Sequence, residues 1–408
     1  MVLFVGIDWS EEHHDVCVVD AEGEVVAKGR VVEGPGAVGR VHELVAEGLG
    51  DGDVDDVEAV VGIETDRGLL VRALIAAGYE VVAVNPLAVD RYRDRHRVSG
   101  AKSDPGDARV LADLVRTDRH LHRPVAGDSV EVEAIKLVAR AHQNAIWSRR
   151  RVANQLRSAL REFYPGALAA FDELHGRDAA AVLAVAPTPS LGRRMSRAKI
   201  AATLRRAGRK INVDARAEAI QAALRADQLA QPATVEDAYG AIVASHARLI
   251  AAHTGEIARL EEALGEGFTK HPDAEIYLSQ PGLGVVTGAR VLGEFGDDPG
   301  RFDTARNRKN YAGTSPITVA SGGRRVVRAR FARNSRLGDA VNWWAFNALQ
   351  TSPGARAYYT QRRAAGDRHN QALRALGNRL VGILHGCLRH RTLYDEHTAW
   401  GHRTPKAA

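Results

Sequence analysis

Five apolar runs in the first part of the chain predict β-strands, at residues 2–8, 15–20, 24–32, 57–64 and 80–84. Short polar turns separate the first three runs, which is typical of an antiparallel meander. Helical spacing of apolar residues is found in the segments that follow, at residues 38–47, 69–77 and 106–115. The N-terminal part is therefore predicted to be a mixed α/β domain.

The order of these elements indicates an RNase H-like fold for residues 1–125, because three meander strands precede alternating helices and strands. Beyond them, apolar positions recur at helical spacing over residues 130–163 and 242–264, which predicts two long helices. Amphipathic helices this far apart in sequence are typical of a coiled coil within one chain or between protomers. We expect a helical coiled-coil region at 126–272 and a mainly α-helical C-terminal domain at 273–395.

Charge is divided unevenly along the chain. Residues 1–70 hold 17 acidic and 4 basic side chains, a net charge of −13; because the whole chain carries +6, residues 71–408 carry +19. This division is typical of a metal-binding part joined to a part that binds a polyanion such as DNA or RNA. A basic run between Leu191 and Lys210 lies in the second part. It is either a phosphate-binding surface or an ordinary solvated one.

Composition predicts a cytoplasmic protein without a membrane span. The sequence contains no apolar run of 18 residues, and its first residues lack the basic start of a signal peptide. Its two cysteines, Cys17 and Cys387, are far apart, which favours a reducing compartment over a disulfide framework or a zinc site.

Four carboxylates are predicted to lie at the ends of elements. Asp8 ends the first strand, Glu64 ends the fourth, and Asp104 and Asp107 stand on one face at the start of a helix. Singly, each is explained by turn chemistry or by a favourable helix start. Together they repel one another unless cations neutralise them, and oxygen ligands suit Mg²⁺ or Mn²⁺. They therefore predict a metal site for phosphoryl transfer.

Two glycine-containing segments mark the C-terminal part. Gln280–Ala289, with Gly282 and Gly284, is similar to one hairpin of a helix-hairpin-helix DNA-binding motif, although an ordinary turn between helices has the same composition. Further on, Ser321 precedes Gly322 and Gly323, which leave its hydroxyl unshielded. The arginines that can neutralise a phosphate beside it are Arg324, Arg325, Arg328 and Arg330.

The acidic motifs resemble a known family. Asp8, Glu64-Thr65, Val84-Asn85-Pro86 and Lys102-Ser103-Asp104-x-x-Asp107-Ala108 together are similar to the DEDD signature of insertion-sequence transposases related to the Piv and MooV DNA invertases. The resemblance implies a RuvC-like N-terminal domain and a C-terminal serine transposase domain. It also implies a nucleophilic serine in a Ser-Gly pair, which corresponds to Ser321, with Ser315 as the second candidate.

The resemblance also implies nucleic-acid partners, and this chain departs from the family pattern at one position. Related proteins are bridge-RNA-guided recombinases, so the implied partners are donor DNA, target DNA and a structured guide RNA. The family pattern places a Leu-Arg pair on the helix after the serine, whereas this chain has Leu337-Gly338.

The expected function is therefore that of a transposase or site-specific recombinase, working as a homo-oligomer, a dimer or a tetramer. An actin-like sugar kinase or ATPase also begins with a Gly-Ile-Asp strand, but no convincing second phosphate motif follows it. A Holliday-junction resolvase-like nuclease accounts for the acids and leaves the C-terminal domain unexplained. A catalytically inert nucleic-acid-binding protein accounts for the charge but not for the acids and Ser321.

Overall fold

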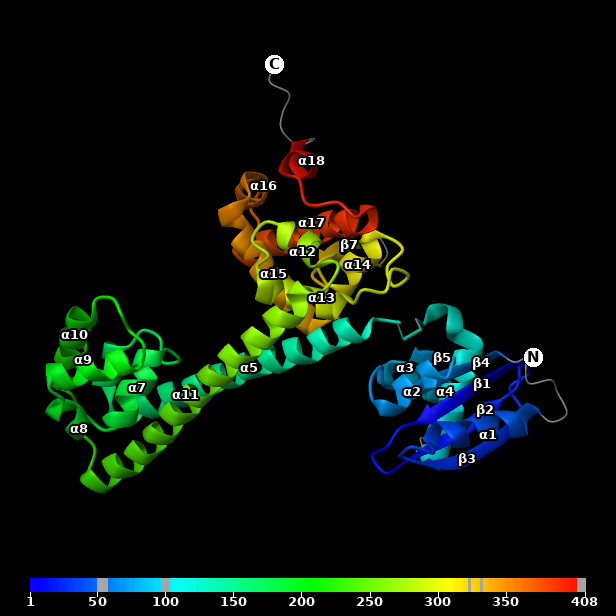
Figure 1. Ribbon diagram of the computed structural model, residues 1–408, viewed down its shortest axis with the longest axis horizontal. Coiled ribbons are helices and arrows are strands. Elements are labelled where there is room, and N and C mark those ends of the chain that lie inside the picture. Colours follow the sequence, from blue (N-terminus) through cyan, green and yellow to red (C-terminus); the bar gives the residue numbers. More distant parts are fainter. Residues whose placement is uncertain are drawn as a thin grey trace, which may run out of the picture. The chain divides into compact units, whose positions relative to one another are not determined.

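The structure, a computed structural model, describes residues 1–49, 58–96, 103–122, 124–125, 127–321, 324–330 and 333–401, without the side chains of His96 and Arg324. It divides into two compact units, Met1–Gly127 and Asp128–Ala408 (Figure 1). Within the described ranges, no helix combines the length and the apolar character needed to cross a membrane.

A five-stranded sheet with the order β3-β2-β1-β4-β5 forms the centre of the first unit. Its strands are β1 (Val2–Asp8), β2 (His13–Val19), β3 (Val25–Val32), β4 (Glu58–Ile63) and β5 (Glu80–Ala83). The helices are α1 (Ala37–Leu49), α2 (Leu69–Ala76), α3 (Pro86–His96), α4 (Asp104–Asp118) and the short 3-10 helix η2 (Arg119–Leu121). The first three strands pair antiparallel, and β1, β4 and β5 run parallel. The predicted mixed α/β domain is confirmed, and its topology is consistent with the RNase H-like fold.

Helix α3 was not predicted, because Asn85-Pro86 was interpreted only as the end of a strand. The side-chain Oδ1 of Asn85 accepts a hydrogen bond from the backbone N–H of Leu87 at 2.9 Å. Asn85 therefore caps the helix, and Pro86 takes a first helical position, where its missing N–H costs nothing. The same dipeptide ends one element and starts the next.

Glycines on two neighbouring strands let α4 lie directly on the sheet. Gly6 of β1 and Gly62 of β4 are paired in register. A Cβ at Gly6 would lie 1.9 Å from the carbonyl oxygen of Ala108, and one at Gly62 would lie 2.7 Å from Cγ1 of Val115. The opposite face of β1, with Leu3, Val5 and Ile7, packs with α1 and α2 in a separate apolar cluster. This close contact fixes where the start of α4 lies relative to the strand ends.

The second unit is mostly helical, as predicted, and is built on two long helices, α5 (Val130–Phe163) and α11 (Ala233–Thr269), which pack along each other. At one end lie α6 (Pro165–Ala170), α7 (Arg177–Val185), α8 (Pro189–Arg194), α9 (Arg197–Arg206) and α10 (Val213–Arg225). The other end holds α12 (Ala274–Ser279), α13 (Val285–Phe295), α14 (Ala305–Tyr311), β6 (Ile317–Ser321), β7 (Arg324–Arg328), α15 (Ser335–Thr351), α16 (Pro353–Ala364), α17 (His369–His390) and α18 (Glu396–Trp400). Figure 1 shows the two groups at opposite ends of the helix pair.

The contact between α5 and α11 is apolar at both ends and polar in the middle. Separate hydrophobic clusters bury Leu156 with Ile250 at one end and Ile135 with Phe268 at the other. Between them, Nε2 of His142 lies 3.1 Å from Oε1 of Glu261, and Arg149 donates to Thr254 Oγ1 at 3.3 Å. The two helices thus bury apolar side chains and pair polar groups with each other within one chain. A contact between protomers along this pair stays a prediction.

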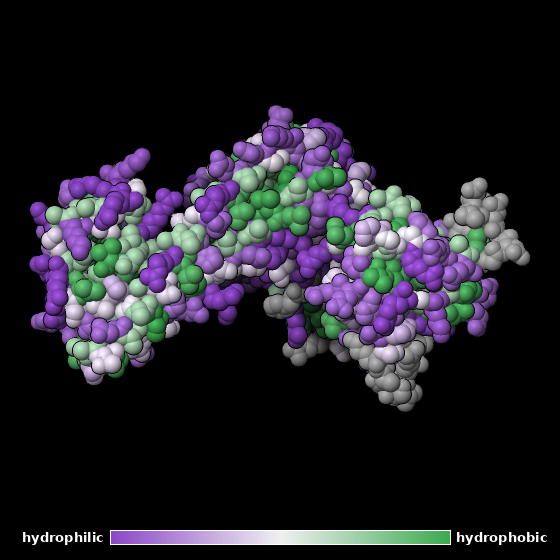
Figure 2. All heavy atoms as spheres, turned by 60° about the horizontal axis from the view of Figure 1, so that its bottom comes forward, coloured by the Kyte–Doolittle hydropathy of each residue, from purple (hydrophilic) through white to green (hydrophobic). Residues whose placement is uncertain are grey.

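The basic run between Leu191 and Lys210 lies on α8, α9 and the turn after them. Its exposed members are Arg193, Arg194, Arg197, Lys199, Arg205, Arg206 and Lys210. Hydrophilic residues rim this group of helices on the face shown at the left of Figure 2. Arg209 is half-buried and paired with Asp178 at 2.6 Å, and two of the exposed members are also paired, Arg205 with Asp214 at 3.1 Å and Arg197 with Glu218 at 3.7 Å.

A β-hairpin interrupts the C-terminal helices, where only helices and a turn were expected. Strands β6 and β7 pair antiparallel, with Ile317 opposite Arg328 and Ser321 opposite Arg324. Gly322 and Gly323, between the strands, lie outside the described residues. Ser321 is therefore the last residue of a strand.

Candidate active site

A row of charged residues crosses the sheet at one edge of the first unit. Asp8 of β1 pairs with Asp15 of β2, and Asp15 pairs with Arg30 of β3. Glu64 follows Ile63, which pairs with Ile7, so Glu64 stands beside Asp8 at the ends of two parallel strands. Side chains alternate between the faces of a strand. Asp8 and Asp15 thus share the face of Gly6, the face that α4 covers, and Glu64 follows β4 directly at the same edge.

The start of α4 brings two further carboxylates to this edge. Asp104 is exposed in the first turn of α4, whereas Asp107, one turn further on, is buried. Ligand atoms of Asp104, Asp15 and His13 all lie within 4.8 Å of one another, a spacing suited to a metal ion. Among the described residues, it is the one group of at least three His, Cys, Asp or Glu side chains whose ligand atoms lie this close together. The four predicted acids belong to elements that end or begin at this edge, but the group at metal-ligand spacing joins Asp104 to His13 and Asp15, two residues that were not predicted.

His13 and Asp15 had a signal in the sequence that was overlooked. The residues 11–14 were interpreted only as the turn between two strands. In an antiparallel hairpin, the start of the second strand lies opposite the end of the first, so an acid at Asp15 must face Asp8. Two carboxylates opposite each other repel, and Arg30 offsets this with contacts of 3.1 to 3.4 Å to both oxygens of Asp15.

Asp107 is held by a cation of the protein. Arg93 of α3 donates from Nη2 to Oδ1 of Asp107 at 2.6 Å and from Nη1 to Asp90 at 3.1 Å. Both side chains of the Arg93–Asp107 pair are largely buried. The pair orients the Asp107 carboxylate toward α3.

These donors fit a divalent cation. Carboxylate oxygens are the ligands that Mg²⁺ and Mn²⁺ prefer, and the imidazole of His13 is a ligand that a transition ion such as Mn²⁺ also accepts. The edge therefore has the donor chemistry for the metal that the sequence predicts, with His13 favouring Mn²⁺.

Ser321 is exposed at the end of β6 in the second unit. Opposite this end of β6 runs β7, on which Arg325 and Arg328 are also exposed, while only the backbone of Arg324 is described. Arg330, just beyond β7, is half-buried, and its Nη2 lies 3.5 Å from Oδ1 of Asn310. The register places Arg324 opposite Ser321, whereas Arg325, opposite Ala320, lies on the other face of the hairpin, and Arg328 lies at its far end, opposite Ile317.

Ser315, the second candidate, has a different environment. Its Oγ lies 3.3 Å from Oδ1 of Asn378 on α17, and the same oxygen accepts a hydrogen bond from Thr314 at 3.1 Å. Ser315 is half-buried. Its hydroxyl is thus engaged in holding the hairpin to α17.

The two predicted phosphate-binding glycines lie in the turn between α12 and α13, but in different environments. Gly282 has φ +73°, and a Cβ there would lie 2.4 Å from the backbone nitrogen of Ala348 on α15, so packing alone accounts for it. Gly284 is exposed at the N-terminus of α13, where backbone N–H groups face outward. Gly284 is the better placed of the two to meet a phosphate.

Family profiles match both parts of the chain. A DEDD-type transposase profile of IS110 covers residues 5–165, which include all four predicted acids. A profile described as transposase of the IS116/IS110/IS902 family covers residues 274–360, which include Ser321. Neither description names a serine recombinase, so the kinship with the Piv and MooV invertases goes beyond these matches.

Relatives match over nearly the full length. A mini-circle putative transposase for IS117 from Streptomyces coelicolor is 46% identical over 404 residues, 98% of this chain and 97% of the relative. An uncharacterized 42 kDa protein of insertion element IS900 from Mycobacterium paratuberculosis is 30% identical over 408 residues, 97% and 98% of the two chains. An uncharacterized 44.8 kDa protein of IS116 from Streptomyces clavuligerus is 30% identical over 397 residues, 96% of each. These matches do not favour the kinase or the resolvase alternative, and they show that this chain belongs to the IS116/IS110/IS902 family of transposases.

Proposed function

We propose that this protein is the transposase of a mobile DNA element, and that it cuts and rejoins DNA with a metal site at the sheet edge and with Ser321. The observation that carries the proposal is the row of Glu64, Asp8 and Asp15 beneath the start of α4. Such a concentration of carboxylates, in a chain of this family, is best explained by cations that act on phosphates.

In this proposal Asp8, Glu64, Asp104 and Asp107 hold Mg²⁺ or Mn²⁺, and Asp15 and His13 are further ligands. Bound there, a divalent cation supplies positive charge for the attacked phosphate and for the oxygens that attack and leave. Arg93 orients Asp107 through an ion pair, and Arg30 orients Asp15 in the same way.

Ser321 is the proposed nucleophile. Its Oγ bonds to a DNA phosphorus while the bond from that phosphorus to one deoxyribose oxygen breaks. The Oγ proton passes to a base, and the departing oxygen takes up a proton and leaves as a hydroxyl. A protein–DNA phosphoester remains, which a second DNA hydroxyl attacks to release Ser321 and rejoin the strand. Arg328, which lies on the same face of the hairpin as Ser321, offsets negative charge on the bound DNA backbone.

The partners in the proposal are donor DNA, target DNA, a structured guide RNA and further copies of this chain. The charge of +19 on residues 71–408 supports binding of nucleic acid. Exposed Leu137, Ile242 and Leu249 on the long helices support contact between protomers in a dimer or tetramer. The boundary between a helical region at 126–272 and a transposase domain at 273–395 belongs to the same proposal.

Strand cleavage by isosteric variants tests the metal site. Asp8→Asn, Glu64→Gln and Asp107→Asn are expected to abolish cleavage of element-end DNA, and excess EDTA to abolish it in the wild type. Asp94→Asn, an exposed acid on α3, is the matched control and keeps full activity. Full cleavage by all three variants, or by the wild type in EDTA, contradicts the proposal.

A further inference from the structure

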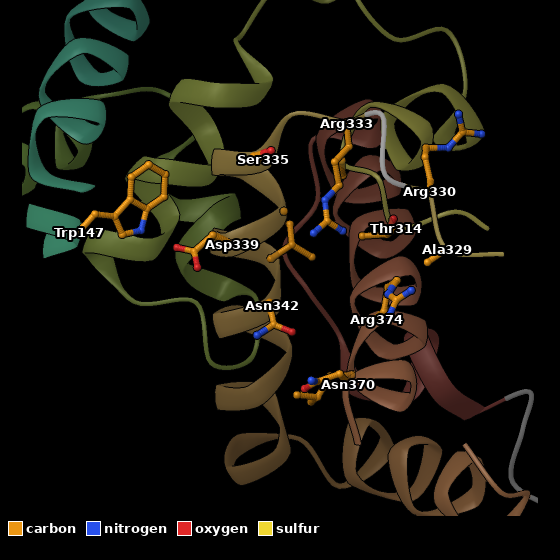
Figure 3. Close-up of a pocket in the computed structure, with 14 residues that line it drawn as sticks. Trp147, Thr314, Ala329, Arg330, Arg333, Ser335, Asp339, Asn342, Asn370 and Arg374 are labelled. Atoms are coloured by element: carbon orange, nitrogen blue, oxygen red, sulfur yellow. The ribbon is translucent and has the colours of Figure 1, made fainter. Parts of the chain in front are cut away.

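A cavity of about 540 Å³ opens between α15 and α17, below the chain that leads out of the hairpin (Figure 3). Its volume lies in the range of small-molecule sites. The lining residues come from α5, the hairpin region, α15 and α17: Trp147, Ala312, Thr314, Ala329, Arg330, Arg333, Ser335, Gly338, Asp339, Val341, Asn342, Asn370, Leu373 and Arg374. Neither Ser321 nor any of the four acids is among them.

The cavity is positively charged. Arg333 and Arg374 have no carboxylate partner and no hydrogen-bond acceptor among the described residues. The one acid of the lining, Asp339, has its carboxylate directed toward Trp147 (Figure 3), where its Oδ2 accepts a hydrogen bond from Gln143 at 3.0 Å and lies 3.9 Å from Arg290. Two guanidinium groups without partners, in a partly enclosed space, favour an anion such as a phosphate.

Two glycines hold Arg333 in the cavity. Gly313 has φ +69°, and a Cβ there would lie 2.2 Å from Cδ of Arg333. On the other side, a Cβ at Gly338 would lie 3.0 Å from Nε of Arg333. Arg333 therefore fills the space that a side chain at 338 would take, and Figure 3 shows it directed between α15 and α17.

The opposite wall suits a nucleobase. Trp147 of α5 is 37% exposed, and the guanidinium of Arg336 lies 5.0 Å from its ring centroid, which covers one face of the indole. Asn342 and Asn370 offer amide donors and acceptors that have no protein partner in the described part of the chain. Aromatic faces and amides of this kind stack with bases and hydrogen-bond to their edges.

We propose that this cavity holds one nucleotide of the bound nucleic acid outside its base stack. Its phosphate contacts Arg333 and Arg374, and its base lies against Trp147, Asn342 and Asn370. The inference rests on the proposed function, because it needs a nucleic-acid substrate, and it adds a site whose lining does not include Ser321. Since DNA and RNA share this chemistry, either can supply the nucleotide.

Binding to bulged duplexes tests the proposal with the full chain. Fluorescein-labelled DNA and RNA duplexes, each with one unpaired nucleotide, are compared with perfect duplexes by fluorescence anisotropy. The wild type is expected to prefer the bulge about 5- to 100-fold in DNA or in RNA, which identifies the source. Trp147→Ala and the double variant Arg333→Gln/Arg374→Gln are expected to lose that preference. Arg389→Gln, an exposed arginine on α17, is the matched control and keeps it.

Two further experiments distinguish failure of the base contact, of the pocket and of the transposase proposal. A bulge with an abasic sugar keeps the phosphate and lacks the base, so equal preference for it contradicts the proposed base contact. Photocrosslinking of a 5-iodouracil bulge to the wild type needs no variant, and peptides containing Trp147, Asn342 or Asn370 are expected. Crosslinks confined to other segments, or variants that behave like Arg389→Gln, overturn the pocket and leave the transposase proposal intact. A wild type that binds no nucleic acid overturns both.

Discussion

Nη2 of Arg93 lies 2.6 Å from Oδ1 of Asp107, so one of the four predicted metal ligands is paired with a cation of the protein. The two side chains are 14% and 6% exposed, and they join α3 to the first turn of α4. A divalent cation at Asp107 must share or displace this guanidinium, because both need the same carboxylate oxygens. In the proposed metal site, Arg93 therefore competes with the cation for Asp107.

Arg93→Gln is expected to lower the free energy of unfolding without metal by about 1–3 kcal/mol, because Asp107 loses its buried partner. The same change is expected to lower the Mn²⁺ concentration that stabilises the protein several-fold, since the metal no longer competes with a guanidinium. Thermal unfolding during a Mn²⁺ titration measures both effects. Arg91→Gln, an exposed neighbour on α3, is the control. An unchanged Mn²⁺ midpoint in Arg93→Gln refutes the competition.

Gly6→Ala is expected to destabilise the protein by about 3 kcal/mol or more, because its Cβ would lie 1.9 Å from the Ala108 carbonyl oxygen and would push α4 off the sheet. Gly39→Ala is the matched control: Gly39 lies within α1, a Cβ there would meet nothing within 4 Å, and alanine should stabilise the helix by about 0.5–1 kcal/mol. Urea denaturation measures both changes. Equal stability of the two variants is incompatible with direct packing of α4 on β1.

The sequence predicted Asp8 correctly as the last residue of β1 and missed the end of β4 by one residue, because β4 ends at Ile63 and Glu64 follows it. It did not yield α3, since Asn85-Pro86 is compatible with both a strand end and a helix start. The β6–β7 hairpin was not predicted, because Gly322-Gly323 was interpreted only as a turn. Two residues between β-forming runs are nevertheless a hairpin signal.

The pocket residues lie beyond what the sequence predicts. Trp147 and Arg374 come from α5 and α17, helices far apart along the chain, and only tertiary packing places them around one space. Arg333 follows an arginine-rich stretch, and nothing in the sequence distinguishes it from its neighbours. Its position depends on the absence of side chains at Gly313 and Gly338, which no local pattern indicates.

Stability is expected to fall as the pH drops below about 6.5, because His142 is buried uncharged among α5, α11 and α13. Burial, and then the Arg290 guanidinium, lower the pKa of His142, although Glu261 opposes this. The unfolded chain, in which His titrates near pH 6.5, therefore binds more protons below that pH, and the folded state loses stability until the lowered pKa is passed. His142→Gln should weaken this loss, as measured by urea midpoints at about pH 7.5 and 5.5. The exposed His175→Gln is the control, and an equal loss in both variants contradicts the assignment.

Nucleic-acid affinity is expected to fall several-fold or more for each doubling of salt, because residues 71–408 carry +19. Arg193→Gln/Arg194→Gln, on exposed α8, should reduce the slope of log affinity against log salt by up to about two if both contact phosphates. Anisotropy titrations over a series of salt concentrations give the slope. Affinity that does not depend on salt rules out a phosphate-dominated interface.

The central claim, cleavage through Ser321 with help from the acidic edge, is tested most directly by trapping the protein–DNA ester. End-labelled element-end DNA is incubated with Mg²⁺ or Mn²⁺ and the protein, resolved on a denaturing gel, and any shifted band is mapped by peptide sequencing. The wild type and Asp94→Asn are expected to give an adduct on Ser321, whereas Ser321→Ala binds DNA normally and gives none, and Asp8→Asn gives little or none. An adduct that persists in Ser321→Ala and maps to Ser315, or strand joining without any adduct, would contradict the account.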